Sequence, residues 1–250
     1  MTLVIFPTLP KDPTMKIQDS VAFVTGANRG LGASFARALL AAGARKVYAA
    51  ARDPSSVDIP GVHAVRLDVT RPGEVLAAAR DFGDVSLLVN NAGIARGQGL
   101  LAGQASIDAL RAELDVNVFG PLAVSQAFAP HLAANGGGAI VNVLSVLSWL
   151  SLPGSGTYSA SKAAAWSLTN GLRNELRAQG TQVVGVHVAF METDMAAGFS
   201  GPKAHPDDVV RQVLAAVEAG EDEVLADDIA RNVKLGLSAR PGVYLGAPAR

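Results

Sequence analysis

The stretch Val21-Ala-Phe-Val-Thr-Gly-Ala-Asn-Arg-Gly-Leu-Gly32 decides the fold of this chain. Its first five residues are apolar or β-branched, which is typical of a strand buried on both faces. Glycines follow at positions 26, 30 and 32 and lead into an alanine- and leucine-rich run, which predicts a helix over 30–42. The free amides at the start of such a helix attract an anion, and glycines let the backbone approach it closely. The stretch therefore predicts a turn that binds the pyrophosphate of a dinucleotide.

Apolar runs of strand length alternate with alanine- and leucine-rich runs of helix length along most of the chain. Further strands are expected at 46–50, 63–67, 85–89, 139–143, 183–187 and 223–226, and further helices near 71–81, 106–134 and 156–178. Continuous apolar strands joined by helices are typical of a parallel sheet with right-handed crossovers. We therefore expect an α/β fold, a single doubly wound Rossmann-type domain with a parallel sheet of about seven strands, over residues 15–250. Residues 1–14 are expected to be an N-terminal extension, and the segment at about 195–206 a flexible substrate loop.

The composition excludes several classes of protein. With 250 residues, 49% of them hydrophobic and 17% charged, the chain can bury the core of one large domain. A formal net charge of −1 gives no general attraction to nucleic acid or to acidic membranes, so no partner of either kind is expected. The absence of cysteine excludes disulfides and thiolate sites, and the first residues lack the basic end and long apolar run of a signal peptide. We expect a cytoplasmic protein.

A second informative feature is the pair Tyr158 and Lys162, with Ser145 upstream. Residues four apart on a helix project from one face, so the phenol and the ammonium can act on the same substrate atom. Reducing a carbonyl requires a hydride on carbon and a proton on oxygen, and a phenol with a pKa of about 10 shuttles protons poorly at neutral pH. An ammonium ~5 Å away favours the phenolate by on the order of 3 kcal/mol, or ~2 pKa units, whereas burial opposes this. The pattern favours Tyr158 as acid or base, Lys162 as its electrostatic partner, and Ser145 as a hydrogen-bond partner of the substrate oxygen.

The order and spacing of these features resemble the short-chain dehydrogenases/reductases. The resemblance extends from about residue 18 to residue 195 and rests on Thr25-Gly-x-x-x-Gly-x-Gly32, Asn90-Asn-Ala-Gly93, Asn117, Ser145 and Tyr158-x-x-x-Lys162. It implies an oxidoreductase of the carbonyl reductase type, which transfers a hydride between a nicotinamide cofactor and a ketone, an aldehyde or a secondary alcohol. It also implies that Lys162 binds the ribose and that Asn117 holds a water linked to Lys162. By its distance before Tyr158, the catalytic serine is expected to be Ser145 and not its neighbours Ser148 or Ser151. The implied catalytic residues are Asn117, Ser145, Tyr158 and Lys162.

The choice of cofactor rests on the charge at the end of the second strand. An acidic residue there binds the ribose hydroxyls of NAD and repels a 2′-phosphate. This strand ends in Ala50-Ala51-Arg52, and Arg29 lies within the glycine turn, so two guanidinium groups can hold the 2′-phosphate of NADP. Both arginines could instead be solvated loop residues, and Asp53 is an acid near the same place. The sequence favours NADP, with NADPH preferred over NADH. The cofactor-binding residues, most of them implied by the resemblance, are Gly26, Asn28, Arg29, Gly30, Leu31, Gly32, Arg52, Asp68, Val69, Asn91, Ala92, Gly93, Tyr158, Lys162 and Thr193.

The sequence departs from the family's pattern after the sixth strand. The family usually has Pro-Gly there, followed by a threonine that contacts the nicotinamide carboxamide, whereas this chain has Val188-Ala189 and keeps Thr193. The residues expected near the hydride site are apolar, which favours a small hydrophobic carbonyl compound or alcohol over a sugar or a polyanion. Any of them could equally be a core residue. The candidate substrate-pocket residues are Leu147, Trp149, Leu152, Phe190, Met195 and Phe199.

Alternative functions are less consistent with the sequence. An NAD-dependent alcohol or hydroxysteroid dehydrogenase of the same family is opposed by Arg29 and Arg52. A non-catalytic dinucleotide-binding scaffold is opposed by the complete set of proton-transfer residues, and a sugar-nucleotide epimerase by the glycine spacing and the short C-terminal region. The four histidines lack the spacing of metal ligands, so no metal site is predicted, and His187 is expected in the core. The resemblance implies a homodimer or a homotetramer, formed through the helices near 120–134 and 156–178.

Overall fold

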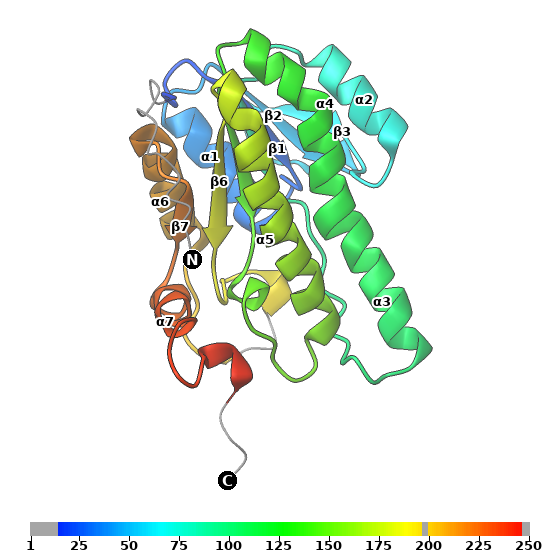
Figure 1. Ribbon diagram of the computed structural model, residues 1–250. Coiled ribbons are helices and arrows are strands. Elements are labelled where there is room, and N and C mark those ends of the chain that lie inside the picture. Colours follow the sequence, from blue (N-terminus) through cyan, green and yellow to red (C-terminus); the bar gives the residue numbers. More distant parts are fainter. Residues whose placement is uncertain (1–14, 197–199, 247–250) are drawn as a thin grey trace.

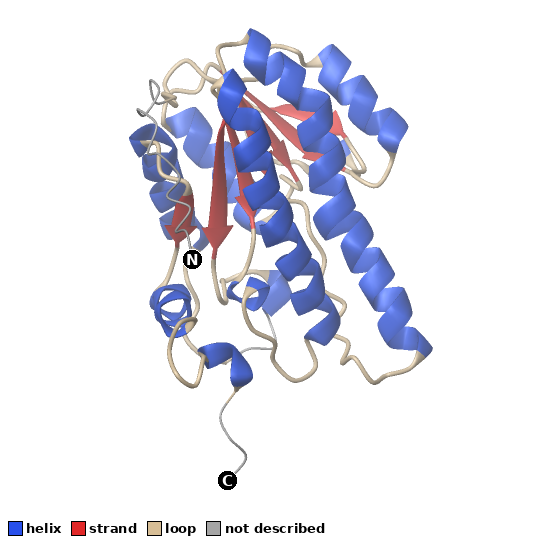
Figure 2. Ribbon diagram, in the orientation of Figure 1, coloured by secondary structure: helices blue, strands red, loops and turns tan. Residues whose placement is uncertain are grey.

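The computed structural model describes residues 15–196 and 200–246, so the expected extension, residues 1–14, lies outside the described part. A seven-stranded sheet forms the middle layer, and helices cover both of its faces (Figure 1, Figure 2). The prediction of a single doubly wound α/β domain is therefore confirmed.

All seven strands are parallel, in the order β3-β2-β1-β4-β5-β6-β7. They are β1 (Val21–Thr25), β2 (Lys46–Ala51), β3 (His63–Arg66), β4 (Leu87–Asn90), β5 (Ala139–Val143), β6 (Gln182–His187) and β7 (Glu223–Leu225). The strand order reverses between β1 and β4. Crossovers on either side of such a reversal leave a crevice at the carboxyl ends of the strands, which is where ligands bind in open α/β sheets.

The helices form two layers. Helices α1 (Gly30–Ala41) and α6 (Pro206–Ala219) lie on one face of the sheet, and α2 (Pro72–Asp81), α4 (Gly120–Ala134) and α5 (Gly156–Leu176) lie on the other. Helix α3 (Gln104–Leu114) extends past the carboxyl end of the sheet beside α5, and α7 (Asp228–Gly236) follows β7 (Figure 1). Successive residues of a strand pack against opposite helix layers. The ring centroid of Phe23 lies 4.9 Å from that of Phe128 on α4, whereas Val24 packs into the core beneath α1 and α6.

Three elements differ from the sequence-based expectations. The strand expected at 85–89 begins at Leu87, because Val85 still belongs to the turn after α2 and donates its N–H to Phe82 O. The helix expected over 106–134 contains a π-helical turn, Asp115–Phe119, between α3 and α4. Such turns are frequent at functional sites, and this one contains Asn117. Helix α7 was not predicted.

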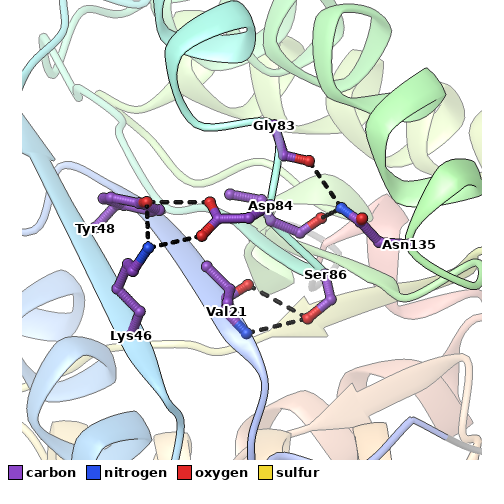
Figure 3. A network of polar contacts seen from close by, with 8 residues as sticks. Val21, Lys46, Tyr48, Gly83, Asp84, Ser86 and Asn135 are labelled. Atoms are coloured by element: carbon purple, nitrogen blue, oxygen red, sulfur yellow. Dashed lines mark hydrogen bonds and ion pairs between the residues drawn. The ribbon is translucent and has the colours of Figure 1, made fainter.

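A polar network connects the amino-terminal ends of neighbouring strands (Figure 3). Asp84 accepts hydrogen bonds from Lys46 Nζ (2.7 Å) and Tyr48 Oη (3.0 Å), both on β2. Ser86 Oγ accepts from the Val21 amide (3.1 Å), and Asn135 Nδ2, just after α4, donates to Gly83 O (2.9 Å). These bonds tie the α2–β4 turn to three neighbouring elements, at the end of the sheet opposite the crevice.

Among residues 15–196 and 200–246, no helix is both long and apolar enough to cross a membrane. The same residues contain no cluster of three or more His, Asp or Glu side chains able to hold a metal ion.

Candidate active site

The glycine turn joins β1 to α1 and is locked to the end of β4. Gly26 (φ +64°) and Gly30 (φ +52°) adopt the left-handed backbone that glycine tolerates best. Asn91 Nδ2 donates to the carbonyls of Thr25 (2.9 Å) and Gly26 (3.0 Å), and a Cβ on Gly26 would lie 2.9 Å from Ala92 Cα. No side chain in the described part of the chain caps the N-terminus of α1, and the first turn of this helix contains no acidic residue. The first amides of α1 are therefore available to an anion, as the sequence predicted.

The charged residues that follow β2 and β3 differ in whether their side chains are already hydrogen-bonded. Asp53 is occupied by its own turn, because its carboxylate accepts from Ser55 N (3.0 Å) and Ser55 Oγ (2.7 Å). Arg52 is exposed beside Asp68. Burial raises the pKa of Asp68, but hydrogen bonds from Thr70 and the positive charges of Arg52 and Arg71 outweigh it and lower this pKa.

Arg29 is held across the crevice by Asp194. The two exposed side chains form an ion pair of 2.6 Å between Nη1 and Oδ2. Thr193 lies beside the same turn, because a Cβ on Gly30 would be 3.3 Å from Thr193 Cγ2. The segment just before the predicted substrate loop is thus brought against the glycine turn, although 165 residues separate Arg29 from Asp194 in the chain.

The four predicted catalytic residues come together at the carboxyl ends of β4 and β5. Ser145 begins a single helical turn after β5, and its Oγ accepts the Leu147 amide at 3.1 Å. Lys162, on α5, donates to Val143 O at 2.8 Å, and its ammonium lies 5.7 Å from the centroid of the Tyr158 ring. Asn117 Nδ2 donates to Ser161 Oγ, on the turn of α5 between Tyr158 and Lys162, at 3.0 Å.

Burial dominates the protonation of this cluster. It lowers the pKa of Lys162, which is 6% exposed, to about 8. It raises the pKa of the half-buried Tyr158 far above its usual value; the Ser145 hydroxyl opposes this shift, and the charge of Glu113 adds to it. The lowering of this pKa expected from Lys162 is therefore not seen in the protein alone, because the cost of desolvating the phenolate exceeds what the Ser145 hydroxyl offsets.

Glu113 is a buried residue near Tyr158 that the sequence analysis did not single out. Its side chain is fully buried; Oε1 accepts the Arg96 amide at 2.6 Å, and Oε2 has no hydrogen-bond partner in the described part of the chain. Asn117 bonds both N and O of Ile94 at 2.9 Å, so the two side chains hold the same segment after β4. The available signal was spacing: residues 113 and 117 lie four apart, on one face of a helix.

The candidate pocket residues are spread over different environments. Leu147 and Phe190 are half-buried, and Leu152 and Met195 are 43% and 58% exposed. Trp149 is buried and stacks on His187, with ring centroids 3.8 Å apart. Phe199 lies outside the described residues. At the unusual Val188-Ala189 turn, Val188 is buried and the Ala189 amide donates to Asp227 Oδ2 at 2.7 Å, which anchors the turn to the start of α7.

A cavity of about 400 Å³ borders the outer side of the glycine turn. Its lining includes Arg29, Ser34 and Arg37 from the α1 side and His205 from the N-terminus of α6. Neither Tyr158 nor Ser145 lines it. This cavity is therefore separate from the proton-transfer cluster.

Known proteins resemble the chain over most of its length. The family model of the short chain dehydrogenases matches residues 20–203. An uncharacterized oxidoreductase of Staphylococcus saprophyticus is 31% identical over 221 residues, which cover 82% of this chain and 93% of that protein. Dehydrogenase/reductase SDR family member 7B of Bos taurus is 29% identical and covers 91% of this chain, with 80% of its own length matched.

One solved structure has the same fold at higher identity. A short chain dehydrogenase from Burkholderia cenocepacia, crystallised in complex with NADP, superposes with a TM-score of 0.88 and is 42% identical, covering 94% of this chain and 100% of that one. The family match, the seven-stranded parallel sheet and the glycine turn agree with one another. The chain belongs to the short-chain dehydrogenase family of NAD(P)-dependent oxidoreductases.

Proposed function

We propose that this protein is an NADP(H)-dependent carbonyl reductase, which interconverts a hydrophobic ketone or aldehyde and the corresponding alcohol. The observation that carries the proposal is the convergence of Ser145, Tyr158 and Lys162 at the carboxyl end of β5. A hydroxyl, a phenol and an ammonium in one crevice are what protonation of a carbonyl oxygen requires.

The described residues fit a nicotinamide dinucleotide. The uncapped N-terminus of α1 presents amides to a pyrophosphate, and a side chain at Gly26 would collide with the backbone of Ala92. Arg52 is exposed at the end of β2, and Asp53 is directed to Ser55, which supports NADPH over NADH as the preferred cofactor. Asp68 and Val69 would flank the adenine, Asn91, Ala92 and Gly93 would line the cofactor, and Thr193 would contact the carboxamide.

When bound, the nicotinamide supplies the hydride or accepts it. Tyr158 donates its phenolic proton to the substrate oxygen during reduction, and its raised pKa keeps the phenol protonated at neutral pH. Ser145 hydrogen-bonds the same oxygen and holds it against the phenol. Lys162, charged below its pKa of about 8, stabilises the phenolate that remains and binds the ribose. Asn117 holds a water through which Lys162 exchanges protons with solvent.

The apolar side chains near the crevice support a hydrophobic substrate. Leu147, Leu152, Phe190 and Met195 are at least partly accessible, and apolar lining with a few polar groups is typical of small-molecule sites. We also propose that the protein is cytoplasmic and forms a homodimer or homotetramer. The exposed Phe119 at the start of α4 and the small side chains of Ala160, Ala163 and Ala164 on α5 support a contact there.

The test of catalysis follows the loss of reduced-nicotinamide absorbance with a panel of hydrophobic ketones and aldehydes. We expect turnover with NADPH, and the Tyr158→Phe variant should lose it at least 1,000-fold, on the order of one general acid's contribution, while still binding NADPH. Tyr244→Phe, at a tyrosine that is 55% exposed near the C-terminus, is the matched control and should keep full activity. Turnover that survives Tyr158→Phe would refute the assigned role.

The test of cofactor choice compares two arginines at opposite ends of β2. Arg52→Gln should raise the KM for NADPH about 10- to 100-fold and leave that for NADH unchanged, because one charge-assisted contact with the 2′-phosphate is lost. Arg45→Gln, just before β2, should alter neither value. Faster turnover with NADH than with NADPH in the unmodified protein would contradict the NADP assignment.

A further inference from the structure

The end of β6 carries a buried histidine that the proposed reaction does not use. His187 is 1% exposed, and its ring stacks on Trp149 at 3.8 Å with 19° between the ring planes. Its Nδ1 lies 3.2 Å from the carbonyl oxygen of Ser145, the predicted catalytic serine. Its Nε2 is buried without a hydrogen-bond partner in the described part of the chain. His187 therefore joins the core to the backbone of the helical turn at residues 145–148, which contains the predicted catalytic serine and is called the catalytic turn below.

The surroundings of His187 determine which ring nitrogen carries the proton. Burial lowers its pKa to about 4, although the Ser145 carbonyl and the charge of Glu223 oppose that shift; Lys234 and Arg173 add to it. The ring is therefore neutral at pH 7 and has a single N–H. A carbonyl oxygen can only accept a hydrogen bond, so the 3.2 Å contact requires that the proton sits on Nδ1.

The unprotonated Nε2 then faces a balanced pair of charges. Glu223 Oε1, on β7, lies 3.6 Å from Nε2 and accepts a hydrogen bond of 2.8 Å from Lys234 Nζ of α7. The same ammonium lies 4.9 Å from the Trp149 ring centroid. Lys234 thus neutralises the carboxylate that would otherwise attract a second proton to the ring, which favours the Nδ1–H tautomer.

The hydrogen bond from His187 Nδ1 is made to the backbone of the predicted catalytic serine itself. The Ser145 carbonyl also accepts the Ser148 amide at 3.0 Å, and Ser145 Oγ accepts the Leu147 amide at 3.1 Å. Fixing this carbonyl fixes the peptide plane that follows Ser145, and the Leu147 amide on the same turn holds the hydroxyl, so the two hydrogen bonds together set the direction of the Ser145 side chain. Burying an imidazole whose Nε2 has no partner is unfavourable, and an apolar ring would fill the same space without that cost.

We propose that His187 is a positioning residue, whose Nδ1–H holds the Ser145 carbonyl and so aims the Ser145 hydroxyl at the substrate oxygen. The inference rests on the proposed function of Ser145. It assigns to the cluster of Trp149, His187, Glu223 and Lys234 the support of the catalytic turn from the β7–α7 side of the sheet.

Two substitutions separate the hydrogen bond from the packing. His187→Phe keeps a ring against Trp149 and removes the donor, whereas His187→Asn loses the ring and keeps an N–H at the same distance from the backbone. We expect the Phe variant to lose about tenfold in kcat/KM for the carbonyl substrate, as for one lost hydrogen bond, with the Kd for NADPH changed less than twofold. The Asn variant should stay within about threefold of the unmodified protein. The basic limb of the Phe variant's pH–rate profile should also move, because the Ser145 hydroxyl lowers the pKa of Tyr158.

The opposite ranking, with His187→Phe fully active and His187→Asn impaired, would overturn the proposal and leave a packing role only. Full activity in both variants would also overturn it. A measurement on the unmodified protein covers the case in which the variants do not fold: ¹⁵N NMR of the histidine ring should show a proton on Nδ1, and a proton on Nε2 would refute the inference. Because this readout needs no turnover, it stays distinct from a failure of the proposed reaction.

Discussion

Alanine substitutions at two glycines, Gly32 and Gly171, should change the free energy of unfolding in opposite directions, because the contacts at the two positions differ. Gly32 is the third residue of α1, and an added Cβ would overlap the Gly26 carbonyl oxygen and lie 2.5 Å from Asn91 Nδ2. Separations under 3.0 Å are essentially never seen for real Cβ atoms, so the turn or Asn91 must move. Gly171 lies within α5, and a Cβ there would meet no atom of residues 15–196 or 200–246 within 4 Å. The same substitution by alanine therefore has two different consequences.

The magnitudes follow from the interactions at each position. In a helix interior, Gly→Ala stabilises by about 0.5–1 kcal/mol, and Gly171→Ala should gain that amount. At Gly32 the same gain is opposed by the loss of the two Asn91 hydrogen bonds, each about 1 kcal/mol, and by strain where the Cβ meets backbone. We expect a net loss of roughly 2–3 kcal/mol, which for a protein of this size lowers Tm by roughly 5–10 °C.

Thermal unfolding and NADPH titration of the two variants make up the assay. Gly32→Ala should melt below the unmodified protein and bind NADPH at least about tenfold more weakly, because the displaced turn carries the amides proposed to hold the pyrophosphate. Gly171→Ala should melt slightly higher and bind NADPH normally. If Gly32→Ala were as stable as Gly171→Ala and bound NADPH equally well, the close packing described for this turn would be wrong.

Three further predictions concern buried titratable groups. Burial lowers the pKa of His187 to about 4, so the folded protein binds fewer protons at this residue than the unfolded chain does. The free energy of unfolding should therefore fall by about 3 kcal/mol as the pH is lowered from 6.5 toward 4. In urea unfolding, the His187→Phe variant should lack this contribution to the pH dependence of stability. Lys162→Met should abolish turnover yet raise the free energy of unfolding at pH 7 by about 2 kcal/mol. With its pKa lowered to about 8, the charged lysine destabilises the fold by roughly 3 kcal/mol below that pH, and the lost hydrogen bond to Val143 O offsets about 1 kcal/mol of the gain; equal or lower stability would contradict this. Glu113→Gln keeps an acceptor for the Arg96 amide and removes a negative charge near Tyr158. The apparent pKa in the pH–rate profile of alcohol oxidation should therefore fall by on the order of one unit. An unchanged profile would show that the charge of Glu113 does not affect the pKa of the phenol.

Much of the fold was predictable because its signals are local. The strand at Val21–Thr25 and the helix that begins at Gly30 match the expected boundaries, since burial on both faces and glycine spacing are written in consecutive residues. The π-helical turn at Asp115–Phe119 was not predictable in the same way. Asn117 within it bonds to Ile94 and Ser161, and those partners are 23 and 44 residues away in the chain.

The sequence by itself determined the family and the parallel sheet, and it predicted the side chains to which the chemistry is assigned under the proposed function, because all of these were inferred from residue type and spacing. Only the tertiary structure decided how these groups behave. It turned Asp53 toward Ser55, paired Arg29 with Asp194 and buried Glu113 near Tyr158. Protonation and hydrogen bonding depend on burial and on neighbours brought from distant parts of the chain, which is why the pKa of Tyr158 moved against the direction that Lys162 alone would impose.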